Sequence, residues 1–96
     1  MKSYASVGRI EKDFAVCEVE MIPIEKSNPD DFDKETKFID IPIKENLLIN
    51  IWFIWGKLQE GDIVVVEHDG EYVTKIYYKD DAEKKRRIEI LQAIME

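Results

Sequence analysis

Short segments with β-strand patterning, separated by turn residues, fill most of this chain. In residues 14–21 small or apolar side chains alternate with a row that becomes acidic: Ala15, Cys17, Val19 and Met21 against Phe14, Val16, Glu18 and Glu20. Because successive side chains of a β-strand point to opposite faces of the sheet, the apolar row is expected to face a core and the acidic row solvent. The pattern restricts this part of the chain to an antiparallel, half-buried sheet.

Five further segments have a β-like composition: 3–10, 38–43, 47–55, 63–67 and 72–78. The tripeptide Glu11–Asp13 predicts a tight turn after the first strand, and Asp69-Gly70 predicts a two-residue hairpin before the last one. Pro42 places the end of the 38–43 strand at an edge. Residues 47–55 are apolar on both alternating faces, and a short helix is the alternative there, although the β-branched and aromatic content favours a strand.

A single helix is predicted over residues 80–95. Asp80 as N-cap places Glu83 at the third helical position, as in a capping box. One face carries apolar side chains that we expect to close the sheet, namely Ile88, Leu91 and Met95, broadened by Ile90 and Ile94. The predicted fold is mainly β (α+β): a small antiparallel β-barrel or meander of five to six strands over 3–78, with one C-terminal α-helix. At 96 residues, the chain 1–96 is expected to form a single domain.

The charge balance restricts the partners. The formal net charge is −7, and nine acidic but only three basic residues lie between Glu11 and Glu35. Such a field repels nucleic-acid backbones and anionic lipids and favours basic partners. Cys17 is the only cysteine, which fits a reducing compartment. Because no signal segment and no apolar run of about 20 residues is present, we expect a cytoplasmic protein without a membrane anchor.

The sequence contains few residues that could form a catalytic, metal-binding or phosphate-binding site. Cys17 and His68 are the only candidate nucleophile and base, but Cys17 lies among apolar residues and His68 in a turn expected to be solvated. One histidine and one cysteine cannot build a zinc site. The loop at 30–33 lacks the glycine and glutamate of an EF-hand, and the basic run 84–87 points around its helix and forms no phosphate-binding face. We expect no catalytic activity, no cofactor and no metal.

Three binding hypotheses remain. The first is a protein-binding accessory module that uses Trp52, Phe53 and Trp55, with a homodimer as one outcome. The second is a phage-type acidic inhibitor, of the anti-CRISPR or anti-restriction kind, whose carboxylates imitate phosphates: Glu18, Glu20, Asp30, Asp31, Asp33 and Glu35. The third is single-stranded nucleic acid stacked on Phe14, Tyr72, Tyr77 and Tyr78, which the acidic charge opposes.

Three segments carry a family resemblance: Gly8–Glu18, Leu58–Val64 and Asp81–Ile88. Together they resemble a family of short bacterial proteins known only as a domain of unknown function. That family opens with an Asp-Arg-Phe/Ile-Glu-Gly-Asp-like hairpin followed by Ala-Val, has a Lys-Glu-Gly-Asp-Val step, and closes with a Glu-, Lys- and Arg-rich helix. Here Gly8 replaces the usual Asp, residues 22–57 form a longer link, and the Leu-Pro step is missing. The resemblance implies a small β-barrel with a terminal helix, no known catalytic residues, and an accessory role, since some relatives are appended to metallo-hydrolase-like proteins.

Overall fold

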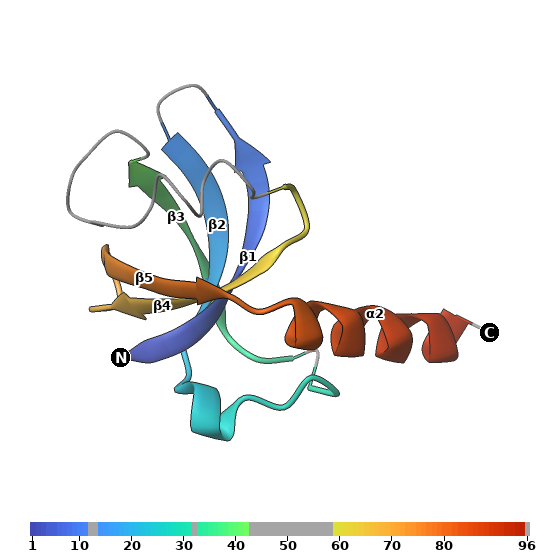
Figure 1. The fold of residues 1–96 in the computed structure, drawn as a ribbon. Helices are drawn as coiled ribbons and strands as arrows, with labels where there is room; N and C mark the ends of the chain where they lie inside the picture. The colour runs from blue at the N-terminus through green and yellow to red at the C-terminus, as the bar shows by residue number, and fades with distance from the viewer. Residues whose placement is uncertain (12–13, 32, 43–58, 96) are drawn as a thin grey trace.

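A computed structural model describes residues 1–11, 14–31, 33–42 and 59–95 (Figure 1). Its elements, in chain order, are β1 (Lys2–Ile10), β2 (Phe14–Glu20), the 3-10 turn η1 (Ile24–Lys26), β3 (Thr36–Pro42), β4 (Ile63–His68), β5 (Val73–Lys79) and α2 (Asp81–Met95). Five of the predicted strands and the helix are therefore confirmed. The predicted strand at 47–55 lies outside the described residues.

The five strands form one antiparallel sheet in the order β3-β2-β1-β4-β5. The central strand β1 pairs with β2 through its second half and with β4 through its first half. This meander with one C-terminal helix confirms the predicted mainly β class, but the sheet is not closed into a barrel. Among the described residues, the edge strands β3 and β5 share no ladder; Lys37 Nζ of β3 donates a hydrogen bond at 3.1 Å to the carbonyl of Gly70, in the turn between β4 and β5.

A bulge in β1 contributes to the curvature of the sheet, and the pairing of β4 with β5 has two further register shifts. Val7 pairs with Cys17 and Arg9 with Val16, so Gly8 has no partner of its own in the ladder. A bulge bends its strand and increases the local twist. A side chain at Gly8 would place its Cβ 3.2 Å from the Val16 carbonyl oxygen, which is why the bulge is built on glycine.

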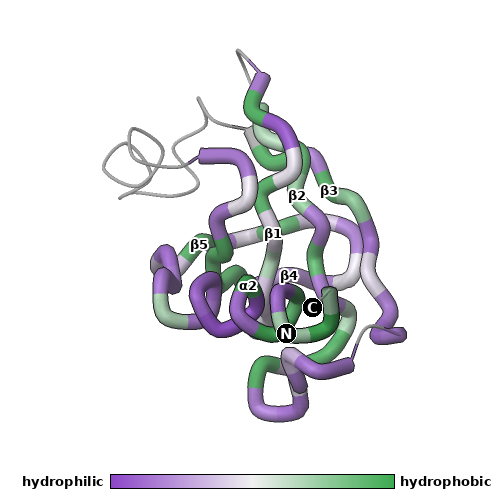
Figure 2. Tube along the Cα trace, turned by 90° about the vertical axis from the view of Figure 1, so that its right-hand side faces the viewer, coloured by the Kyte–Doolittle hydropathy of each residue, from purple (hydrophilic) through white to green (hydrophobic). Residues whose placement is uncertain are grey.

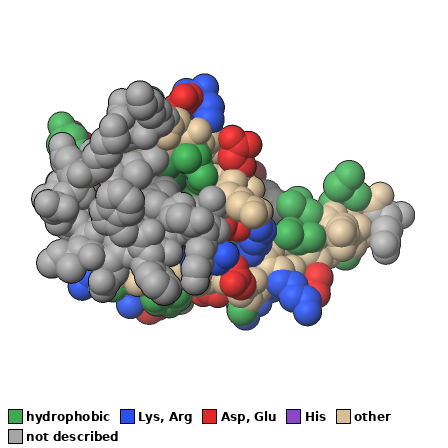
Figure 3. All heavy atoms as spheres, turned by 45° about the horizontal axis from the view of Figure 1, so that its top comes forward, with side chains coloured by type: hydrophobic (Ala, Val, Ile, Leu, Met, Phe, Trp, Pro, Cys, Tyr) green, Lys and Arg blue, Asp and Glu red, His purple; other side chains and the backbone are tan. Residues whose placement is uncertain are grey.

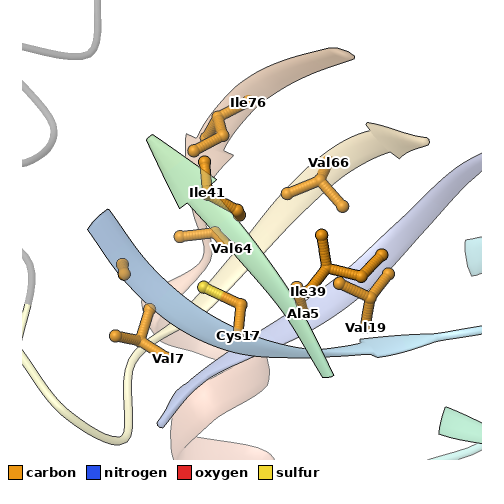
Figure 4. Close-up of a cluster of buried hydrophobic side chains, with 10 residues drawn as sticks. Ala5, Val7, Cys17, Val19, Ile39, Ile41, Val64, Val66 and Ile76 are labelled. Atoms are coloured by element: carbon orange, nitrogen blue, oxygen red, sulfur yellow. The ribbon is translucent and has the colours of Figure 1, made fainter. Parts of the chain in front are cut away.

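The core lies inside the curve of the sheet. Figure 4 shows side chains from all five strands converging on it, and the cluster consists of Ala5, Val7, Ala15, Cys17, Val19, Ile39, Ile41, Val64, Val66 and Ile76. The two edge strands contribute Ile41 and Ile76 to this one cluster, although they do not pair. Contacts between apolar side chains, and not a closed ladder, therefore hold the two edges over a shared interior.

The helix begins as the sequence predicts. The Glu83 N–H donates to Asp80 Oδ1 at 3.0 Å, which confirms Asp80 as N-cap. Only this half of the capping box forms, because the Asp80 N–H donates to the Ile63 carbonyl of β4 at 2.8 Å. The start of α2 is thereby fixed to β4.

The direction of α2 contradicts the prediction that its apolar face closes the sheet. The helix runs away from the sheet in Figure 1, and Figure 2 views it nearly along its axis. Its one buried residue is Glu83. Ile88 and Leu91 are 44% and 47% exposed, so the core forms without them.

Ile41→Ala should lower the free energy of unfolding by about 2–5 kcal/mol, because it removes a fully buried side chain that joins β3 to the core. Phe38→Ala on the same strand is the control. Phe38 is 66% exposed, so its loss should change stability by no more than about 0.5 kcal/mol. Equal effects of the two substitutions in urea unfolding would contradict this assignment of the core.

Candidate functional site

One face of α2 changes character along the helix. Spacings of four, three and four residues place two rows side by side on it. The rows are Glu83, Arg87, Ile90, Ile94 and Lys84, Ile88, Leu91, Met95. The first row begins near the sheet with two charged residues and the second with one, and both rows end with apolar residues beyond the sheet. We call residues 83–87 the charged half and residues 88–95 the apolar half of α2.

The first attachment of the charged half centres on Glu20 of β2, which is 3% exposed. Its carboxylate contacts Arg87 Nη1 at 2.8 Å and Lys34 Nζ at 3.2 Å. The Ser27 hydroxyl donates to its other oxygen at 2.6 Å. Both oxygens of Glu20 are therefore satisfied within the protein, and one of their partners belongs to α2.

Glu83 of α2 adds a second carboxylate to this cluster. It is 3% exposed and accepts hydrogen bonds from Arg87 Nε at 3.1 Å and Arg86 Nη1 at 3.0 Å. The Arg87 guanidinium also lies over the ring of Tyr4 on β1, 5.0 Å from its centroid. Burial and the neighbouring Glu83 carboxylate raise the pKa of the Tyr4 hydroxyl, so this ring acts here as a neutral surface for the cation.

The second attachment centres on Asp62, which precedes β4 and is 2% exposed. Its carboxylate contacts Lys84 Nζ at 2.5 Å and Lys79 Nζ at 3.9 Å, and accepts the Gln59 N–H at 2.8 Å. Burial opposes ionisation of Asp62, but the hydrogen bonds from Lys84 and Gln59 and the two lysine charges outweigh it and lower its pKa. Two buried carboxylates of the sheet region thus hold the charged half of α2.

Apart from the half-buried Ile90, the apolar side chains of this half are exposed. Ile94 and Met95 are 63% and 85% exposed, more than Ile88 and Leu91 nearer the sheet. Figure 3 shows apolar side chains along the projecting helix. Sequence reasoning assigned these residues to the core because an apolar helical face normally covers one. Lys84 and Arg87 lie beside this face in the sequence pattern too, where their stems are expected to cover core; in the structure they instead pair with Asp62 and Glu20.

The residues predicted to bind a partner differ in how far they are exposed, and three of them are not described. Trp52, Phe53 and Trp55 lie outside the described residues. Glu18 is half-buried on β2, whereas the four acids between η1 and β3 are exposed: Asp30, Asp31, Asp33 and Glu35. Glu20 differs from these because it is buried in ion pairs. Glu18 and Asp31 line one groove together with Leu91 of the apolar half.

His68 is buried at 2% exposure, so the expectation that it is solvated is wrong. It lies at the end of β4, where its N–H donates to the Met1 carbonyl at 2.9 Å and draws the residue into the sheet. Burial, and then the charge of the N-terminal ammonium, lower the pKa of His68. The imidazole is therefore held neutral inside the protein.

The hydrogen bonds of His68 decide what it can do. Its Nδ1 accepts the Gly70 N–H at 3.1 Å, so the neutral ring carries its proton on Nε2. That nitrogen lies 2.9 Å from Ser3 Oγ, which itself donates to the Ile22 carbonyl at 2.7 Å. The ring thus donates to Ser3 and cannot take its proton as a general base.

Burial also disfavours the thiolate form of Cys17, the candidate nucleophile. Cys17 is fully buried, and burial raises the pKa of its thiol to about 12. Within the described ranges, no three His, Cys, Asp or Glu side chains gather closely enough to hold a metal ion. No helix among those residues is long and apolar enough to cross a membrane.

Glu20→Gln should destabilise the protein by about 3 kcal/mol, because it leaves Arg87 and Lys34 without their shared buried carboxylate. The matched control is Glu25→Gln, at an exposed position of η1. In a double-mutant cycle, Arg87→Gln in the Glu20→Gln background should cost less than it does alone. Additive losses in urea unfolding would contradict the coupling.

On unfolding, the imidazole of His68 regains its ordinary pKa of about 6.5. Its contribution to the free energy of unfolding should therefore be largest above that pH. It should fall as the pH drops from there through the lower pKa of the folded state, because the unfolded chain binds the proton first. Urea unfolding between about pH 7.5 and 5.5 should show this loss relative to His68→Gln, at no more than about 1.4 kcal/mol per pH unit. If the free energies of unfolding of the wild type and His68→Gln changed in parallel with pH, the assignment of this loss to His68 would be contradicted.

Comparison with known proteins adds no relative. The chain matches no family model, no curated protein and no solved structure. Its likeness to the family of short bacterial proteins thus stays a prediction from three sequence segments. The feature that bears on function is α2, whose charged half is held by ion pairs and whose apolar half projects from the sheet.

Proposed function

We propose that this chain is a non-catalytic accessory module of the cytoplasm that binds a partner protein, and that the apolar half of α2 belongs to its contact surface. The observation that carries the proposal is the change of character along one helix face. Ion pairs fix the charged half to the sheet, while the apolar half exposes Ile88, Leu91 and Ile94. Adjacent exposed apolar side chains of this kind mark interaction surfaces.

The energetics favour association over solvation of this face. Full burial of one exposed Leu or Ile side chain contributes about 1.5–3 kcal/mol. Several such side chains on one rigid helix can offset the loss of translational and rotational freedom on binding. Because the charged half fixes the direction of the helix, little further ordering is needed when a partner docks.

The buried state of the candidate nucleophile and base supports a role without catalysis. Cys17 is fully buried, and both ring nitrogens of the buried His68 are used in hydrogen bonds to Ser3 and Gly70. The acidic-inhibitor hypothesis has weaker support, since Glu20, one of its six carboxylates, is used inside the protein. We therefore place it second.

A photo-crosslinking residue at Ile94 should capture one partner protein in the cells that produce this chain, and the same residue at Glu89 should not. The two positions lie on different sides of α2, and both are exposed. Mass spectrometry identifies the partner, which is then purified for titration. Leu91→Glu should weaken its binding at least about tenfold, while the unfolding midpoint stays unchanged.

Two results would contradict the proposed surface. One is equal crosslinking from Ile94 and Glu89, which would indicate unspecific contact. The other is unchanged affinity of the purified partner for the Leu91→Glu variant.

A further inference from the structure

We infer that the groove beside the apolar half of α2 receives a basic amphipathic helix of the partner protein. The inference rests on the proposed function and specifies the chemistry of the partner. The groove lies between α2, the loop 28–35 and the adjoining ends of β2 and β3, and its volume is about 280 Å³. Its walls include Leu91 and Arg87 from α2, Pro29 and Asp31 from the loop, Glu18 from β2 and Thr36 from β3.

The groove combines apolar and acidic walls. Leu91 and Pro29 offer apolar surface, and Glu18 and Asp31 offer carboxylates. Leu91 is 47% exposed and belongs to the apolar half of α2. The groove is thus continuous with the face proposed to bind the partner, and it extends that face toward the acidic loop.

Each positive charge in the groove walls is paired with a carboxylate, although the buried Nη2 atom of Arg87 has no hydrogen-bond partner among the described residues. Arg87 pairs with Glu20 at 2.8 Å and with Glu83 at 3.1 Å, and Lys34 pairs with Glu20 at 3.2 Å. Neither Glu18 nor Asp31 forms an ion pair with any other described residue. Counting the described residues alone, the unpaired charge at the groove is negative, and Asp30, Asp33 and Glu35 extend the negative charge along the loop.

Charge complementarity therefore selects the occupant. Basic side chains that reach Glu18 and Asp31 gain attraction in a partly desolvated setting, and the net charge of −7 speeds their encounter. A second copy bound around a two-fold axis through the groove would bring the same carboxylates toward each other, which costs free energy. A heterologous basic segment fits the groove better than self-association does.

Helical form follows from the shape of the apolar half. Ile88, Leu91 and Met95 form a row along the α2 axis, with Ile94 beside it. A second helix can lie along such a row with apolar anchors spaced three and four residues apart. Lys or Arg residues flanking those anchors then face the carboxylates of the groove.

The test uses a fluorescent Leu/Lys amphipathic helical peptide of about 18 residues and a Leu/Glu peptide with the same apolar positions. Anisotropy titration of the full chain should show binding of the basic peptide and at least about tenfold weaker binding of the acidic one. Raising NaCl from about 0.05 M to about 0.3 M should weaken the basic complex.

A matched pair of double variants separates the groove from net charge. Glu18→Lys with Asp31→Asn changes the groove and keeps the oxygen that accepts the Asp33 N–H. Glu60→Lys with Glu71→Gln makes the same change in net charge at exposed sites outside the groove. The groove variant should lose at least about tenfold in affinity for the basic peptide, and the control variant should lose at most about twofold.

Three results would overturn the inference: equal losses in the two double variants, equal binding of the acidic peptide, or a dimer in light scattering that Leu91→Glu dissociates. Each is separable from failure of the proposed function. If the partner crosslinked at Ile94 binds the groove variant normally, the function stands and the inference fails. If the basic peptide binds as expected but Ile94 captures no partner, the groove chemistry stands and the proposed function fails.

Discussion

The ion pair between Glu20 and Arg87 sets the relation between the sheet and the helix. Glu20 ends β2 with its carboxylate buried, and Arg87 reaches it from the second turn of α2. Asp62 and Lys84 repeat the arrangement beside β4. Two buried carboxylates therefore fix where the helix begins and in which direction it leaves the sheet.

Attachment through charges has a consequence that apolar packing would not have. A buried ion pair contributes little net stability compared with apolar residues of the same volume, but losing one partner is costly, so its geometry is strongly enforced. Because Glu83, Lys84 and Arg87 hold the helix, its isoleucines and leucine are not needed for the core. They are left at the surface, where a partner can bury them.

The same arrangement determines the chemistry of the surface. The sheet places Glu18 beside the groove, the loop after η1 places Asp31 there, and α2 adds Leu91. These residues are far apart in sequence, and none is informative alone. Together they line the groove with apolar and acidic side chains, and this combination is the basis on which we propose a basic helix as its occupant.

The sequence by itself determined the five described strands and the helix. Alternation in 14–21 and the other β-like segments, the turn residues and the Asp80 cap are local signals, and local backbone preference decides whether they form strands or a helix. It also determined that Cys17 is an inert, buried thiol, since its neighbours in the strand are apolar.

Only the tertiary structure decided which charges are buried and where the helix points. Glu20 and Asp30 look alike in sequence, yet one is enclosed by Lys34 and Arg87 while the other is exposed. His68 follows a strand and looks solvated, but the pairing of β4 with the start of β1 buries it. The amphipathic pattern of α2 shows that its apolar face needs a cover and does not say whether the sheet or another molecule provides it. The ion pairs that answer this join residues 62 with 84 and 20 with 87, and their geometry exists only once the sheet has folded.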